Sequence, residues 1–140
     1  MESRLAADLV ALYRAVDYRV EAPEGRFVLR VGARSEELAA MLAAHGQECA
    51  AFITACNPLG EAADPERNAK ALAALKADLE AEGCATLGAL GEGKGGWPGE
   101  RSLLALGLGR EAAKRLGRRY GQNAVLWAGK DAVPELVLLR

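Results

Sequence analysis

Side chains suited to hydrogen bonding or stacking stand where predicted strands and helices begin or end. They are Thr54, Asn57, Asn68, Trp97, Glu100, Ser102, Gln122 and Asn123. Hydroxyls and primary amides offer directional donors and acceptors, which suit recognition of a polar ligand. The one carboxyl of the set, Glu100, adds acid–base chemistry if burial beside Trp97 raises its pKa toward neutrality.

Asn57 stands where the most apolar run of the chain stops. The run CAAFITAC (49–56) is typical of a strand covered on both faces. Because strand side chains alternate, Thr54 and Cys56 are expected on one face of it. Pro58 is expected to hold Asn57 extended. Two interpretations stay open: a turn in which the asparagine bonds its own backbone, and a ligand site, since ligands collect at the carboxyl ends of strands in open α/β sheets.

Two further pairs of polar residues stand where later strands begin: Glu100 with Ser102 at the predicted strand 102–108, and Gln122 with Asn123 at the predicted strand 123–129. If both strands run antiparallel to the apolar run, their starting ends lie beside its finishing end. The sequence then predicts a polar cleft at this end of the sheet. Trp97 would form an apolar or stacking wall, and Asn68 lies one turn into the helix that follows.

The elements that position these groups are read from hydrophobic periodicity and turn residues. Helices are predicted over 2–17, 35–45, 64–83 and 110–121, and strands over 18–22, 26–32, 49–56, 84–90, 102–108, 123–129 and 135–140. The alternation predicts one α/β domain over 1–140, with an α+β fold as the alternative. Three to four helices pack on a mixed, mostly antiparallel sheet of about five to six strands, and the β-α-β unit 26–56 is expected to be a right-handed parallel crossover.

Two glycine-rich segments match phosphate-binding patterns. GEGKGG (91–96) has the spacing G-x-G-x-x-G, but Trp97-Pro98-Gly99 follows where such a site needs a helix start. GLGREA (107–112) does follow a predicted strand and open a helix, yet Gly109 is also explained as a permissive helix entrance. We expect a loop and an ordinary helix start at these places, and no cofactor.

Charge and composition argue against several classes of protein. The net charge of −1 and the pI of about 5.9 give no general attraction to nucleic acid or anionic membranes. No apolar stretch approaches the ~20 residues that cross a bilayer, and the first residues lack a signal-peptide pattern. The three cysteines form no C-x-x-C pair and His45 is the single histidine, so no metal site is expected. We expect a cytoplasmic protein with no membrane partner.

Four segments, FITACNP, DPERNAKAL, GWPGERSLLALG and RRYGQNAVLW, together resemble the bacterial family known as domain of unknown function 3293. The resemblance extends over nearly the whole chain, including Tyr13 to Tyr18. It implies a small stand-alone bacterial protein without an assigned activity. The matching positions are Thr54, Asn57, Pro58, Asn68, Trp97, Glu100, Ser102, Gly121, Gln122, Asn123 and Ala124. One departure is Cys56, where the family pattern has a larger hydrophobic or aromatic residue, and this weakens the case for a catalytic thiol.

The leading hypothesis is a domain that binds a small polar ligand in the cleft. An enzyme of hydrolase or transferase type is the first alternative, with Glu100 as acid or base and Thr54 or Ser102 activated or orienting a water. A protein- or nucleic-acid-interaction module that uses the basic helix 110–120 is the second. The slightly acidic net charge argues against nucleic acid, and the usual role of such a charge cluster is solvation.

Overall fold

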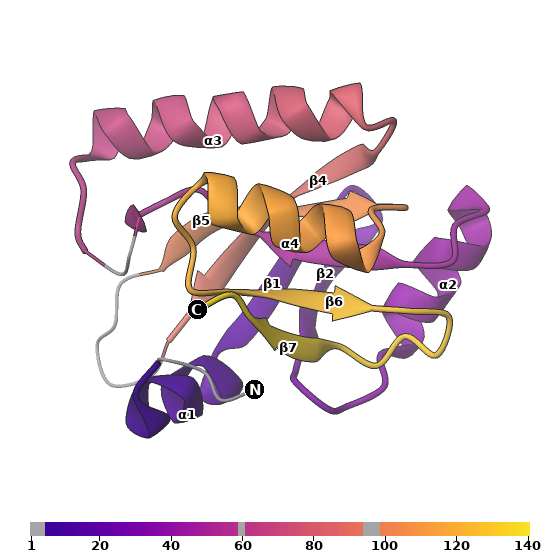
Figure 1. Ribbon diagram of the computed structural model, residues 1–140. Coiled ribbons are helices and arrows are strands. Elements are labelled where there is room, and N and C mark those ends of the chain that lie inside the picture. The colour runs from indigo at the N-terminus through magenta and orange to yellow at the C-terminus, as the bar shows by residue number, and fades with distance from the viewer. Residues whose placement is uncertain (1–4, 59–60, 94–98) are drawn as a thin grey trace.

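The computed structural model describes residues 5–58, 61–93 and 99–140 of the chain (Figure 1). Its helices and strands follow one another in the predicted order: α1 (Ala7–Ala15), β1 (Asp17–Ala22), β2 (Gly25–Leu29), α2 (Glu36–His45), β3 (Ala50–Ile53), α3 (Pro65–Ala81), β4 (Ala85–Glu92), β5 (Glu100–Leu106), α4 (Arg110–Arg119), β6 (Ala124–Ala128) and β7 (Glu135–Leu138). No helix in these parts of the chain has the length and apolar composition that crossing a bilayer requires.

The seven strands form one sheet in the order β2-β1-β4-β5-β3-β6-β7, so the expectation of five to six strands was too low. Every neighbouring pair is antiparallel, which corrects the expected mixed sheet and makes the fold α+β. The predicted parallel crossover over 26–56 is also wrong. The turn between Ala22 and Gly25 folds β2 back onto β1, and this hairpin takes the edge of the sheet, with β4 and β5 between it and β3.

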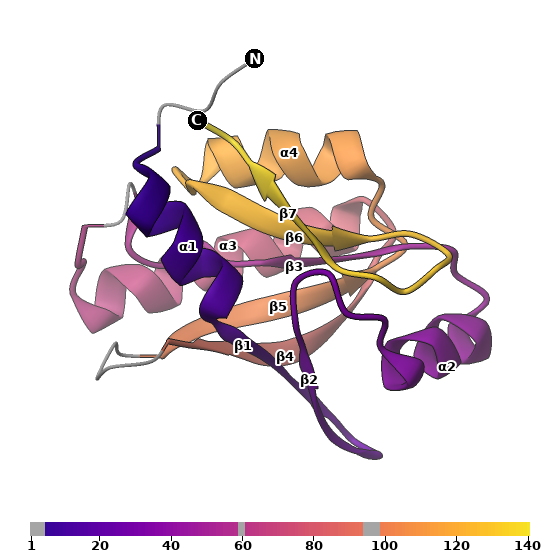
Figure 2. The same cartoon turned by 90° about the horizontal axis from the view of Figure 1, so that it is seen from below.

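Helices cover both faces of the curled sheet. Helices α3 and α4 lie together on one face, whereas α1 and α2 lie on the other (Figures 1 and 2). The alternation of β3 divides its side chains between two cores: Phe52 packs with the α2 residue Leu38, and Ile53 packs with Leu75 of α3. All residues of β3 are buried, as its continuous apolar sequence predicts.

The condition that brings the polar residues together is met. Strand β3 lies between β5 and β6 and runs antiparallel to both. Ile53, the last residue of β3, therefore pairs with Leu103 near the start of β5, and Phe52 pairs with Leu126 of β6. The end of β3 and the starts of its two neighbours lie side by side at one end of the sheet.

Candidate functional site

A cavity of about 190 Å³ opens at this end of the sheet, and its lining includes Phe52 and Leu126 from the core on the α2 face. Its polar and apolar lining residues include Tyr13, Tyr18, Phe52, Thr54, Asn57, Glu100, Ser102, Gln122, Asn123, Leu126 and Leu136. We call it the site cavity. Asn68 joins it through Asn57, and Trp97 lies outside the described residues. The remaining side chains predicted for the cleft all line this one space.

Asn57 is held in place by a network of amide hydrogen bonds. Its backbone N–H donates to Oδ1 of Asn68 at 2.9 Å, and the Nδ2 of Asn68 donates back to the Oδ1 of Asn57 at 2.9 Å. The same Oδ1 accepts the backbone N–H of Ala63 at 3.0 Å. Because a backbone N–H can only donate, this bond fixes which side of the amide carries the oxygen. The Nδ2 of Asn57 is therefore directed at Glu100.

The backbone of Asn57 differs from the extended conformation expected before a proline. Its φ is 49°, in the left-handed region that asparagine tolerates better than most residues. The local turn was the open alternative to a ligand site, but the side chain reaches Ala63, Asn68 and Glu100 rather than its own backbone. These bonds offset the unfavourable conformation, and they override the bias that Pro58 imposes.

Glu100 opens β5 and is half-buried in the wall of the site cavity. Its Oε2 accepts the Nδ2 of Asn57 at 2.8 Å. Burial raises the pKa of this carboxyl above its usual range, and the bond from Asn57 opposes that rise without cancelling it. A carboxyl in this position can act as a hydrogen-bond acceptor or, once its pKa approaches the ambient pH, as a proton carrier.

The hydroxyls near Glu100 donate their hydrogen bonds to main-chain carbonyls. Thr54 Oγ1 donates to the carbonyl of Arg101 at 2.7 Å, and Ser102 Oγ donates to the carbonyl of Glu100 at 3.1 Å. Cys56 is buried and its thiol lies 3.5 Å from the same Arg101 carbonyl, while burial raises its pKa. None of these bonds joins a hydroxyl or thiol to the Glu100 carboxylate, so the described residues supply no activated nucleophile.

Gln122 and Asn123 close the site cavity from the start of β6. The Nε2 of Gln122 donates to the carbonyls of Cys56 and Tyr120 at 3.0 and 3.1 Å, which ties the end of β3 to the end of α4. The Nδ2 of Asn123 donates to the hydroxyl of Tyr13 at 2.9 Å. Both amides are buried, with 8% and 6% of their surface exposed.

Two tyrosines complete the site cavity, although the sequence reasoning did not assign them to it. Tyr18 donates its hydroxyl to the carbonyl of Tyr13 at 2.6 Å, and its ring packs edge-on against Phe52 with 5.1 Å between centroids. Burial, with Tyr13 and Glu100 nearby, raises the pKa of Tyr18 well above its ordinary value. The sequence did hold a signal for Tyr18: a tyrosine in a predicted strand buries its ring, and its hydroxyl then needs a hydrogen-bond partner.

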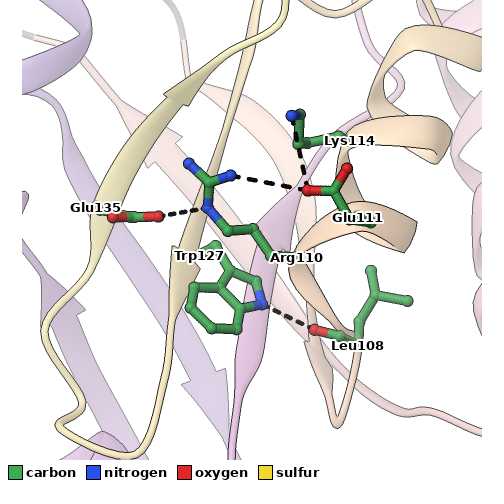
Figure 3. A network of polar contacts seen from close by, with 6 residues as sticks. All are labelled: Leu108, Arg110, Glu111, Lys114, Trp127 and Glu135. Carbon is green, nitrogen blue, oxygen red and sulfur yellow. Dashed lines mark hydrogen bonds and ion pairs between the residues drawn. The ribbon is translucent and has the colours of Figure 1, made fainter.

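The basic helix α4 has acidic partners along its length. Arg115 contacts Glu82, the C-cap of α3, at 2.6 Å, and Arg119 contacts Asp78 of α3 at 3.3 Å. At the other end, Figure 3 shows Arg110 between the carboxylates of Glu135, at 2.7 Å, and Glu111, at 3.8 Å. Lys114 lies 3.7 Å from the carboxylate of Glu111. These pairings reduce the positive potential that a nucleic-acid surface would need.

The glycine-rich patterns show no built nucleotide site in the described residues. Gly109 is the N-cap of α4, and the first helical side chain, Arg110, is engaged by glutamates. This helix start lies at the opposite end of the sheet from the site cavity. In GEGKGG (91–96), the first residues extend β4, and residues 94–96 lie outside the described part of the chain. Among the described residues, no three of His, Cys, Asp and Glu gather as metal ligands would.

Comparison with known proteins gives one result at the level of sequence family. The family model described as "Protein of unknown function (DUF3293)" matches residues 53–125. This span begins at the end of β3 and includes Asn57, Glu100 and Gln122. Neither a curated protein nor a solved structure matches the chain.

Proposed function

We propose that this chain, which belongs to the DUF3293 family of proteins of unknown function, binds a small polar molecule in the site cavity. The observation that carries the proposal is the meeting of Asn57, Glu100, Gln122 and Asn123 around one open space. Cavities of roughly 150 Å³ hold a benzene-sized molecule. The volume of about 190 Å³ therefore suits a compact ligand.

The composition of the cavity supports binding as its main role. The apolar side chains of Phe52, Leu126 and Leu136 lie beside a small number of fixed polar groups, which is the usual make-up of small-molecule sites. The hydrogen bonds made by the side-chain amides of Asn57 and Gln122 hold those polar groups in place before any ligand binds. A preformed site of this kind loses little conformational entropy on binding.

An enzyme of hydrolase or transferase type is the second candidate. Glu100 favours it, because a half-buried carboxyl of raised pKa beside a cavity is a typical acid or base. The mechanism would use this carboxyl to move a proton at the bound molecule, while the Tyr18 hydroxyl, whose raised pKa keeps it protonated, stays bonded to the carbonyl of Tyr13. The hydroxyls of Thr54 and Ser102 bond main-chain carbonyls instead, so binding remains the stronger proposal.

Filling the site cavity from β4 tests the proposal. Gly91 pairs with Tyr18 on one side and Glu100 on the other, so a side chain added there enters the same space. An added Cβ would meet Val16 at 3.8 Å, an ordinary contact. We expect Gly91→Val to fold normally, because valine suits a strand better than glycine, and to lose ligand binding.

The measurement is a thermal-shift screen of the wild type against nucleotides, amino acids and sugars, followed by the variants. A ligand that binds only the native state raises its apparent stability. Gly88→Val is the matched control, because Gly88 lies on the opposite face of the same strand with open space around it. A shift that Gly91→Val retains would place the ligand elsewhere and contradict the proposal.

A further inference from the structure

The hydrogen-bond donors around the site cavity are largely used within the protein. Both N–H groups of Gln122 face main-chain carbonyls, which can only accept, so the orientation of this amide is fixed. The hydroxyls of Thr54, Ser102 and Tyr18 also donate to main-chain carbonyls. Counting only bonds within the described residues, one amide N–H each on Asn57 and Asn123 remains after the bonds to Glu100 and Tyr13.

Hydrogen-bond acceptors make up most of the hydrogen-bonding capacity that the described lining of the site cavity leaves unused. Glu100 uses Oε2 for the bond from Asn57, and among the described residues no donor reaches its Oε1. The Oε1 of Gln122 likewise accepts no bond from the described part of the chain. The hydroxyl oxygens of Ser102 and Tyr18 keep lone pairs. Hydrogen bonds to an ionised acceptor are roughly twice as strong as neutral ones, so the carboxylate outweighs the two leftover amide N–H groups.

The charges around Glu100 favour a positively charged ligand. Of the described residues that line the site cavity, none is basic. From the neighbouring elements, Tyr18 and Cys56 lie close enough to Glu100 for its negative charge to add to the rise that burial causes in their pKa values. Arg101 is exposed beside it on β5. Arg140 bonds the Oδ1 of Asn123 at 3.0 Å, outside the cavity lining.

We infer that the ligand of the site cavity is a small organic cation, an amine or amidine with a compact apolar body, whose N–H groups bind Glu100 and the Oε1 of Gln122. This inference rests on the proposed function, since it names the ligand class of the same site. The apolar body packs against Phe52, Leu126 and Leu136. An anion would meet the Glu100 carboxylate in a space whose described lining holds no basic residue, which costs binding free energy.

The test uses three probes that share one aromatic ring: benzylammonium, benzyl alcohol and benzoate. Titrations of the full chain at pH 7 follow the side-chain amide signals of Asn57, Gln122 and Asn123 by NMR. We expect benzylammonium to move these signals with the highest affinity. Glu100→Gln keeps the shape of the side chain and should weaken that binding by roughly tenfold or more, because it removes a charge-assisted bond. Glu82→Gln removes a carboxylate at the far end of the sheet and should change nothing.

The outcomes separate the ligand class from the site itself. Loss of benzylammonium binding in Glu100→Gln alone supports the inference. If benzoate or benzyl alcohol binds as tightly as the cation, or if Glu100→Gln keeps the cation, the ligand class is overturned and the cavity stands as a binding site. If no probe moves the amide signals at saturating millimolar concentration, both the class and the proposed function are contradicted.

Discussion

Glu100 is the residue at which the folded structure gives up stability to keep a chemical group in the site cavity. Its carboxyl is half-buried and accepts one side-chain bond, from Asn57. Replacing such a group often stabilises a protein but costs it function, because binding sites keep polar groups that folding alone would not select. The cost should therefore be measurable, and it should depend on pH.

We predict that Glu100→Gln raises the melting temperature at neutral pH. Burial raises the pKa of Glu100 in the folded state above its value of about 4.3 in an unfolded chain. The folded state therefore holds the proton to higher pH, and the free energy of unfolding of the wild type falls as pH rises through the window between the two pKa values. Glutamine has no such loss, so the advantage of the variant should vanish below about pH 4, grow as the pH rises through that window and level off above it.

Melting curves of both proteins across this range check the prediction. Glu82→Gln is the control for removing one carboxylate, since Glu82 is exposed and bonds Arg115 far from the cavity. An advantage that is constant with pH, or largest in acid, would show that the burial of an ionised Glu100 is not the cause.

The orientation of Asn57 gives a second prediction at the residue scale. Asn57→Asp places a second carboxylate against Glu100, where Nδ2 donates at 2.8 Å in the wild type. We expect a loss of about 2–4 kcal/mol of unfolding free energy at pH 7, from one charge-assisted bond and the new repulsion. Adding Glu100→Gln should recover at least half of it, because the glutamine can donate to the new carboxylate. Denaturant titrations of the wild type, both single variants and the double variant measure this coupling; additive effects would contradict the assigned contact.

At the scale of elements, the position of Gln122 depends on how closely α4 packs against the sheet. Gly117 lies on the buried face of α4, and a Cβ there would come within 2.5 Å of the Cδ1 of Leu139 and 2.9 Å of the Cγ1 of Val125. Gln122 follows this helix and bonds both its end and the end of β3. The absent side chain lets the helix lie close enough for that bridge.

We therefore predict that Gly117→Ala lowers the free energy of unfolding by about 1–3 kcal/mol, despite the higher helix propensity of alanine. Overpacking against the β-branched Val125 is the physical reason. Gly88→Ala, which has open space, should stay within about 0.5 kcal/mol of the wild type. Urea denaturation of both variants provides the comparison, and equal stability of the two would mean that α4 can move away from the sheet without loss.

The elements themselves were readable because local signals agree with the final structure. Asp64 caps α3 through the N–H of Arg67, followed by Pro65 as the first helical residue, as predicted from these two residues. Ser35 caps α2 in the same way. Strand pairing was less readable, because the periodicity of a strand does not specify its neighbours. The parallel crossover failed for this reason: β2 pairs with β1, and β3 pairs with strands that come later in the chain.

At the scale of the whole molecule, the site depends on contacts between residues far apart in the sequence. The alternation of β3 and the polar residues at strand ends predicted which side chains gather, given the right strand directions. Nothing local indicates that α1 would bring Tyr13 to Asn123, a contact between positions 110 residues apart. The left-handed Asn57 was also beyond local rules, since the network with Ala63 and Asn68 outweighs the bias before Pro58.

The most direct measurement is a crystal structure of the protein soaked with a library of small fragments that includes amines, neutral polar compounds and carboxylates. We predict fragment density in the site cavity, between the carboxylate of Glu100 and the side-chain oxygen of Gln122, with the ring or chain of the fragment against Phe52. Fragments that gather reproducibly at another surface while this cavity stays empty, or a cavity filled by the protein's own side chains, would contradict it.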